Sequence, residues 1–272
     1  MTHKFDFSER TAFLPLLDAY LSCKLSKNFH SALEIGVYKG GWLFNLIDNL
    51  PGILAIGIDP YPSIDQVKQT FISECVRRGL NESISLYSSF DELRSSDQRL
   101  LKFDIIHCDG EHSQSQASLD LNDSLSCLDE AGILIIDDVF YHSYPGVTAA
   151  AFSFIGQYNL SPFLFTQKKL YVCNSKHYEY YYAKAFSILS TLEVNFEVSE
   201  TEDPRQSYKQ SNSIFGYNLI ITSEQPHRTE FNSLCRILEV RIPLLIKTKI
   251  FVKAWMPPRI YDLILKAKKI KF

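Results

Sequence analysis

The chain has 272 residues, a net charge of −3 and 46% hydrophobic residues. These values lie close to the globular average and exclude a disordered chain or a fibre. No apolar run reaches the ~20 residues of a membrane-spanning helix, and the acidic N-terminal segment argues against export by a secretory signal. The six cysteines form no CxxC pair, so we expect reduced thiols and a cytoplasmic location.

Apolar strands and amphipathic helices alternate along the first two thirds of the chain. The pattern predicts strands at 32–36, 53–58, 84–87, 103–108 and 132–136, with helices at about 8–25, 42–50, 63–79 and 113–128. Beyond these elements it predicts a helix at 147–158, a hairpin at 163–173, a helix at 177–192 and strands around a polar loop at 193–223.

This alternation predicts an α/β fold. We expect a Rossmann-like, doubly wound, mostly parallel sheet of about seven strands, with helices on both faces and C-terminal accessory elements. The expected organisation is a core at 1–175, cap elements at 176–225 and a basic amphipathic tail at 226–272.

The end of the chain differs from the rest in charge. Residues 241–272 carry nine Lys or Arg and one acid, which leaves −11 for residues 1–240. We expect this tail to pack on its own chain or on a second subunit of a homo-oligomer. Peripheral contact with an anionic membrane is the second alternative. Nucleic acid ranks last, because the body is acidic and carries no recognition motif.

Glycines and an aspartate follow the first two strands. Gly36 and Gly40 are spaced as G-x-x-x-G, so the dinucleotide fingerprint is absent, and no lysine follows as a P-loop requires. Asp59 lies at the tip of the second strand, where a carboxylate can accept both hydroxyls of a ribose. The alternative for Asp59 is a turn-forming residue before Pro60.

Three carboxylates and an imidazole follow two later strands. Asp109 and His112 come after the strand at 103–108, and Asp137 and Asp138 end the strand at 132–136. Grouped carboxylates repel unless they are protonated or bridged by a cation, and such oxygen donors suit Mg²⁺. Adjacent strand residues point to opposite faces, so Asp137 and Asp138 can both bind one ion only if the chain leaves the sheet there. We interpret His107, inside the strand, as a core histidine.

These features occur in the segments LEIGVYKGG, GIDP, FDIIHCDGEH, GILIIDD and YPGV. Together they resemble the class I S-adenosylmethionine-dependent methyltransferases, in particular the branch with a D-G-x-H signature that includes metal-dependent sugar O-methyltransferases. The resemblance covers roughly residues 30–175. Trp42 and Asp138 depart from the pattern of many relatives, and residues after 176 match nothing that can be aligned.

The resemblance implies roles for individual residues. It implies a cofactor site for S-adenosylmethionine at Glu34, Gly36, Gly40, Asp59, Ser89 and Asp109. It implies a Mg²⁺-class ion at Asp109, Asp137 and Asp138, with Asp109 and His112 as catalytic residues and His112 as the general base. Ser89 has the alternative role of a helix cap, and His142 is a second candidate base.

The implied activity is methyl transfer to a hydroxyl of a sugar, glycan or other small molecule. Two alternatives remain open: a metal-independent methyltransferase of the same fold, and a non-catalytic cofactor-binding or scaffold protein. The sequence does not identify the molecule that accepts the methyl group.

Overall fold

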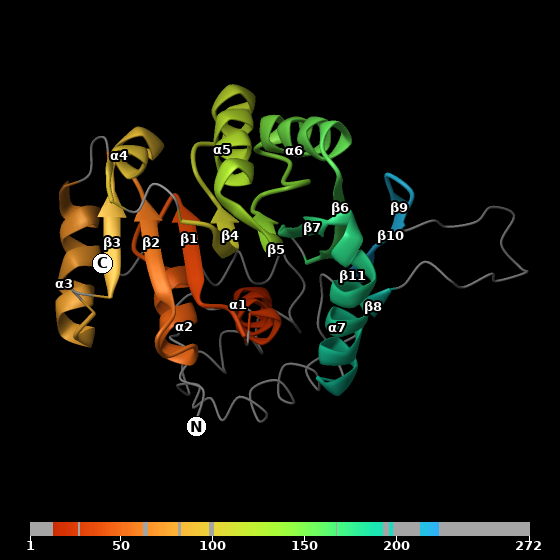
Figure 1. Ribbon diagram of the computed structural model, residues 1–272, viewed down its shortest axis with the longest axis horizontal. Helices are drawn as coiled ribbons and strands as arrows, with labels where there is room; N and C mark the ends of the chain where they lie inside the picture. The colour runs from red at the N-terminus through yellow and green to blue at the C-terminus, as the bar shows by residue number, and fades with distance from the viewer. Residues whose placement is uncertain are drawn as a thin grey trace, which may run out of the picture.

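The structure is a computed structural model (Figure 1) that describes residues 13–26, 28–61, 65–80, 83–97, 101–166, 168–192, 196–197 and 213–222. Its main feature is a nine-stranded sheet with the order β3-β2-β1-β4-β5-β7-β6-β11-β8. Strands β1 to β5 run parallel, and β7 runs antiparallel to both β5 and β6. The predicted Rossmann-like fold class is therefore confirmed.

The described part of the sheet has nine strands rather than about seven, because two short C-terminal strands extend it beyond β6. β11 pairs with β6 in parallel, and β8 pairs with β11. The sheet consists of β1 (Ser31–Ile35), β2 (Leu54–Ile58), β3 (Ile84–Tyr87), β4 (Phe103–Cys108), β5 (Leu128–Ile136), β6 (Leu160–Phe165), β7 (Leu170–Asn174), β8 (Phe196–Glu197) and β11 (Ile220–Thr222). A separate hairpin consists of β9 (Ser213–Ile214) and β10 (Tyr217–Asn218).

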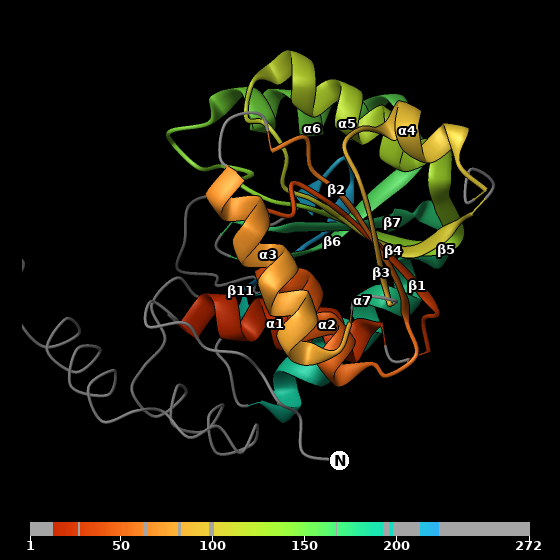
Figure 2. The ribbon, with the colours of Figure 1, turned by 90° about the vertical axis from the view of Figure 1, so that its left-hand side faces the viewer.

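Helices cover both faces of the sheet, as Figure 2 shows. One face carries α1 (Phe13–Leu25), α2 (Gly41–Asn49) and α7 (Tyr178–Thr191). The other carries α4 (Phe90–Ser95), α5 (Gln114–Cys127) and α6 (Pro145–Gln157). α3 (Asp65–Arg78) packs on α2 through the stacked rings of Phe71 and Phe44. Helices on both faces bury both sides of the central strands, which explains their uninterrupted apolar sequences.

Successive residues of each central strand enter different hydrophobic cores. In β5, Ile133 and Ile135 pack toward α1, α2 and α7, whereas Leu134 and Ile136 pack toward α5 and α6. The same alternation separates Ile105 from its neighbour Ile106 in β4. This period of two continues past the strand ends and decides which polar side chains meet there.

The segment after residue 175 adds packing to this framework. A 3-10 turn, η1 (Ser175–His177), leads into α7, which packs on α1 and β6. The hydroxyl of Tyr178 donates to the Asn218 carbonyl, and that of Tyr181 donates to the Ala131 carbonyl. The tail at 226–272 and the loop at 198–212 lie outside the described residues.

Among the helices of the described ranges, none is both long and apolar enough to cross a membrane.

Candidate active site

The sequence-predicted site residues lie at the carboxyl ends of β1 to β5, with Ser89 after β3. In the register of the sheet, Glu34 of β1 lies opposite His107 of β4. Backbone hydrogen bonds extend the pairing by one residue: the Asp109 N–H donates to the Ile35 carbonyl, and the Asp137 N–H donates to the Cys108 carbonyl. The sheet thus places Glu34, Asp109 and Asp137 side by side. They lie at its topological switch point, where the strand order reverses and β1 and β4 are neighbours.

Gly36 is required by close packing at this switch point. Its φ is +81°, and a Cβ built on it would lie 1.8 Å from the carbonyl oxygen of Asp109. Gly40 has a φ of +76°, and its Cβ would lie 2.7 Å from ring atoms of Phe44 and Phe71. The turn after β1 therefore needs glycine at both positions for shape as well as for conformation.

Glu34 lies beneath this turn and is 3% exposed. One carboxylate oxygen lies 3.2 Å from Nδ1 of His107. The other, Oε2, is buried and has no hydrogen-bond partner in the part of the chain that the structure describes. Burial raises the pKa of Glu34 against the lowering effect of His107. An unsatisfied buried oxygen is costly, so this atom points to a ligand that donates a hydrogen bond.

Asp59 holds the two loops that follow β1 and β2. Its carboxylate accepts hydrogen bonds from the N–H groups of Tyr38 and Tyr61, each at 2.8 Å. Each oxygen retains a lone pair for a further donor, so this turn role and a ribose role are compatible. Ser89 is the N-cap of α4, where its side chain accepts from the Glu92 N–H. Its alternative role as a helix cap is therefore the one observed.

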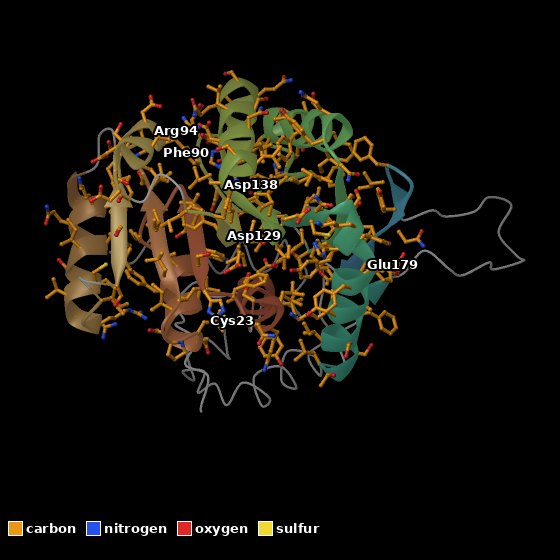
Figure 3. The ribbon with its side chains drawn as sticks, viewed as in Figure 1. Cys23, Phe90, Arg94, Asp129, Asp138 and Glu179 are labelled. Atoms are coloured by element: carbon orange, nitrogen blue, oxygen red, sulfur yellow. The ribbon has the colours of Figure 1, made fainter. Side chains whose placement is uncertain are left out.

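The predicted metal ligands separate into two groups that share Asp109. We call His107, Asp109 and Asp137 the inner group, and Asp109, His112 and Asp138 the outer group. Within each group, one donor atom per residue lies within 4.8 Å of the others. Asp137 follows the alternation of β5 toward α1 and α2, so it joins the inner group. Asp138, labelled in Figure 3, has a φ of +57°, contacts His112 and joins the outer group.

A lysine that the sequence does not predict as a site residue, Lys169, contacts the inner group. Lys169 donates to Asp137 Oδ2, and its Nζ lies 2.8 Å from His107 Nε2. Burial opposes ionisation of Asp137, but the Lys169 ammonium holds the pKa of that carboxyl well below its usual range. Burial and the Asp137 charge raise the pKa of Asp109 to about 7. His107 is 2% exposed and stacks on Trp42, as expected for a core histidine.

The outer group lies closer to the surface. His112 Nε2 lies 3.1 Å from Asp138 Oδ2 and 3.9 Å from Asp109 Oδ1, and its side chain is 36% exposed. Its ring stacks on Tyr144 with the centroids 3.9 Å apart. Lys168 donates to Asp138 Oδ1 at 2.8 Å. His112 is thus oriented by a carboxylate and an aromatic ring while part of it stays accessible.

A pocket beside these groups is lined by polar residues that include Asp109, Glu111, His112, Asp120 of α5 and Asp137, together with apolar residues of α5 and α6. The second candidate base, His142, is exposed and contacts Tyr141 edge-on. The pocket therefore includes His112, whereas His142 does not line it.

Lys168, Lys169 and Asp18 are the site residues that sequence reasoning missed. The lysines precede the apolar strand β7, and Asp18 lies on α1, about 150 positions away. The Tyr171 hydroxyl of β7 donates to Asp18 Oδ1 at 3.3 Å. The available signal was a pair of lysines directly before an apolar strand, but only the antiparallel β5–β7 pairing brings them to Asp137 and Asp138.

The buried Asp18 predicts a pH-dependent stability. Burial raises the pKa of Asp18 to about 6, against an ordinary value of 3.8. The folded state therefore holds this proton more tightly, and the contribution to stability is lost as pH rises from about 4 through 6. We expect Asp18→Asn to reduce the loss of unfolding free energy between pH 4.5 and 7.5 by about 2 kcal/mol. Urea titrations at both pH values measure this.

The matched control for Asp18 is Asp91→Asn, since the Asp91 side chain is 94% exposed. Its pH profile should stay parallel to the wild-type profile. If Asp18→Asn also gives a parallel profile, the buried Asp18 carboxyl is not the titrating group.

The strand ends described above lie within the range of a known protein family. A family described as "Methyltransferase domain" matches residues 33–139, which run from β1 to the turn after β5. A search of curated proteins found no match.

Solved structures of similar fold include three methyltransferases. One is the methyltransferase PaMTH1 of Podospora anserina bound to SAH, with 13% identity, coverage of 61% of this chain and 80% of that chain, and a TM-score of 0.49. The O-methyltransferase of Bacillus cereus in complex with SAH has 15% identity, coverage of 63% and 82%, and a TM-score of 0.44. The TDP-rhamnose 3'-O-methyltransferase CalS11 of calicheamicin biosynthesis has 13% identity, coverage of 58% and 77%, and a TM-score of 0.47. At these values the likenesses carry no argument about substrate or mechanism.

The family match covers the glycine turn, Asp59, Asp109 and the acidic pair after β5, which are the positions that the sheet gathers at one edge. Residues 33–139 of this chain match the methyltransferase domain family.

Proposed function

We propose that this methyltransferase acts on a hydroxyl oxygen of a sugar, glycan or other small molecule, with assistance from a divalent cation. The observation that carries the proposal is the buried, unpartnered oxygen of Glu34 beneath the Gly36 turn, next to the acidic outer group. Asp109 belongs to the outer group and its backbone N–H donates to Ile35, the residue after Glu34, so a methyl donor and an acceptor bound at these two features would be neighbours.

The residues on the donor side fit S-adenosylmethionine. Glu34 Oε2 suits the ammonium of the methionine part, because it is a buried acceptor that lacks a donor. The turn at Gly36 leaves no space for a Cβ, so a ligand can approach its backbone closely. Asp59 keeps lone pairs for the ribose hydroxyls. We therefore assign the cofactor to Glu34, Gly36, Gly40 and Asp59.

The residues on the acceptor side suit a divalent cation, but with a different set of ligands from the one that the sequence predicts. Asp109 and Asp138 offer carboxylate oxygens in the outer group, which suit Mg²⁺ with water or acceptor oxygens completing the coordination. Asp137 lies in the inner group and is paired with Lys169. The three predicted carboxylates are thus not gathered as one ligand set, and we assign the ion to Asp109 and Asp138.

Each group has a separate task in the proposed reaction. When bound, S-adenosylmethionine supplies an electrophilic methyl group and the cation favours the ionised form of a hydroxyl. His112 removes the hydroxyl proton, and Asp138 keeps its ring oriented through the 3.1 Å contact. The ring of Tyr144 stacks on His112, and the ring of Tyr141 lies against Tyr144, so these aromatic side chains can cover the face of a ring-shaped acceptor. Holding donor and acceptor in line contributes much of the remaining rate.

A metal-independent transfer is a second candidate, favoured by the two lysines. Lys168 pairs with Asp138 and Lys169 with Asp137, so both carboxylates already have a positive partner. The two candidates differ in the effect of a chelator. Excess chelator abolishes turnover in the first candidate and leaves it unchanged in the second, with cofactor affinity retained in both.

The experiment that tests the cofactor assignment is calorimetry with S-adenosylmethionine. Asp59→Ala removes an acceptor of two ribose hydrogen bonds and should cost about 1–3 kcal/mol, or roughly 5- to 150-fold in Kd. The control is Asp91→Ala, an exposed aspartate on α4 that should bind as the wild type does. Undiminished binding by Asp59→Ala, or no binding by the wild type, would refute the assignment.

A further inference from the structure

Lys169 is the one described lysine whose ammonium lies within the inner group. Its side chain is 13% exposed, compared with 41% for its neighbour Lys168. The Nζ atom contacts two members of the group, Asp137 Oδ2 and His107 Nε2. A buried ammonium is costly unless it is paired and hydrogen-bonded, and both conditions are met here.

The contact between Lys169 and His107 determines which ring nitrogen of His107 carries the proton. A lysine ammonium has three donors and no acceptor, so Nε2 of His107 accepts the hydrogen bond at 2.8 Å. Nδ1 then carries the proton and donates to Glu34 Oε1 at 3.2 Å. The hydrogen bonds run from Lys169 through His107 to Glu34. They leave Glu34 Oε2 without a hydrogen-bond partner among the described residues.

The same contacts leave the inner group poorly suited to a metal ion. The Nε2 lone pair of His107 and Oδ2 of Asp137 are both directed at Lys169. A divalent ion bound by those atoms would lie beside a buried ammonium, where the low dielectric strengthens repulsion between the two cations. In the outer group, Lys168 is half exposed and can move into solvent when an ion binds at Asp138.

We propose that Lys169 is a positioning residue that serves as the permanent cation of the inner group. It holds Asp137 and His107 in place, sets the Nδ1–H tautomer that orients Glu34, and confines divalent ions to the outer group. This inference deepens the proposed function and rests on it only for the outer ion.

The test measures binding of Mn²⁺ to the full chain, without cofactor or acceptor, by the loss of the free-ion paramagnetic resonance signal. The wild type should bind one Mn²⁺. Asp138→Asn should weaken binding by roughly 10- to 100-fold, whereas Asp137→Asn should change it less than about 3-fold. Lys169→Met should strengthen binding about 10-fold or admit a second ion, because it frees the inner donors. Lys168→Met is the matched control and should leave the number of ions at one.

A second readout reports on the histidine directly. Nitrogen NMR of His107 should show the Nδ1–H tautomer in the wild type and in Lys169→Arg, which keeps the cation. Lys169→Met should lose this tautomer preference. The tautomer of His107 is measured on the wild-type protein, so this readout remains valid even if Lys169→Met fails to fold.

Each outcome separates the inference from the proposed function. Loss of wild-type Mn²⁺ binding in Asp137→Asn would overturn the inference, since Asp137 would then be a ligand. An Nε2–H tautomer in the wild type would also overturn it. If the wild type binds no Mn²⁺ but Lys169→Met does, the inference holds and the metal part of the proposed function fails. If neither binds, Lys169 does not exclude an ion and the inference is overturned.

Discussion

Replacement of His112 by alanine is expected to lower kcat by about 10²–10⁴-fold, the usual loss when a general base is removed. The reason is that the imidazole lies at the outer group, oriented by Asp138 at 3.1 Å and by the ring of Tyr144. Cofactor affinity should be retained, because His112 has no part in the Glu34–Gly36–Asp59 assignment. Steady-state kinetics with calorimetry of S-adenosylmethionine binding measure both quantities.

The control for this prediction is His142→Ala. His142 is exposed on the loop before α6 and contacts Tyr141, so its removal should change kcat little. A comparable loss in His142→Ala would transfer the role of base to that residue.

The main alternative for His112 is a ligand or an orienting partner of the ion. In that case His112→Ala should lower metal affinity by roughly 10- to 100-fold, and high Mg²⁺ should restore activity. Recovery of kcat at high Mg²⁺ would therefore remove His112 from the role of base. A loss that persists at saturating Mg²⁺ would support it.

Replacement of Gly36 by alanine is expected to cost about 3–5 kcal/mol of unfolding free energy and to abolish detectable cofactor binding. A Cβ at this position would lie 1.8 Å from the Asp109 carbonyl oxygen and 2.9 Å from Cα of Gly110. Both are backbone atoms that belong to the β1–β4 contact, so neither can move without separating the two strands. Urea denaturation and calorimetry measure the two effects.

Gly52→Ala is the matched control for this clash. Gly52 has a φ of +89°, but a Cβ there would meet nothing within 4 Å. It should therefore cost only about 1–2 kcal/mol, the strain of a left-handed backbone for a residue with a side chain. The difference between the two variants measures the close approach of β1 to β4. Equal costs would mean that Gly36 is needed for its φ alone.

The central sheet illustrates what could be predicted from local pattern. The apolar runs of β1, β2, β4 and β5 are bounded by turn residues and separated by helical periodicity, so their existence, their order in the chain and the edge at which they end all follow from the sequence. The start of β5 was placed at Gly132 rather than Leu128, because Asp129 and Glu130 do not have the apolar character used to recognise a strand. The strands β8 and β11 have only two and three residues, too few for any periodicity to be seen.

The site residues follow the same division. The position of Glu34, Asp59, Asp109 and His112 near strand ends could be read from the sequence, since each lies in the last part of an apolar run or in the short turn that follows one. Their partners could not be read in this way, because Lys168 lies 30 positions from Asp138 and Lys169 lies 32 positions from Asp137, and both reach them only through the β5–β7 pairing.

The sequence by itself determined the class of fold, the edge of the sheet that carries the site and the chemical types gathered there, because hydrophobic periodicity and strand ends are local properties. The tertiary structure decided which of these side chains belong to the inner group and which to the outer group. The alternation of β5 sends Asp137 to the side of α1 and α2 and Asp138 to the side of α5 and α6, and each meets a different lysine. Which charges neutralise one another depends on contacts between distant segments, and such contacts are set by packing rather than by spacing along the chain.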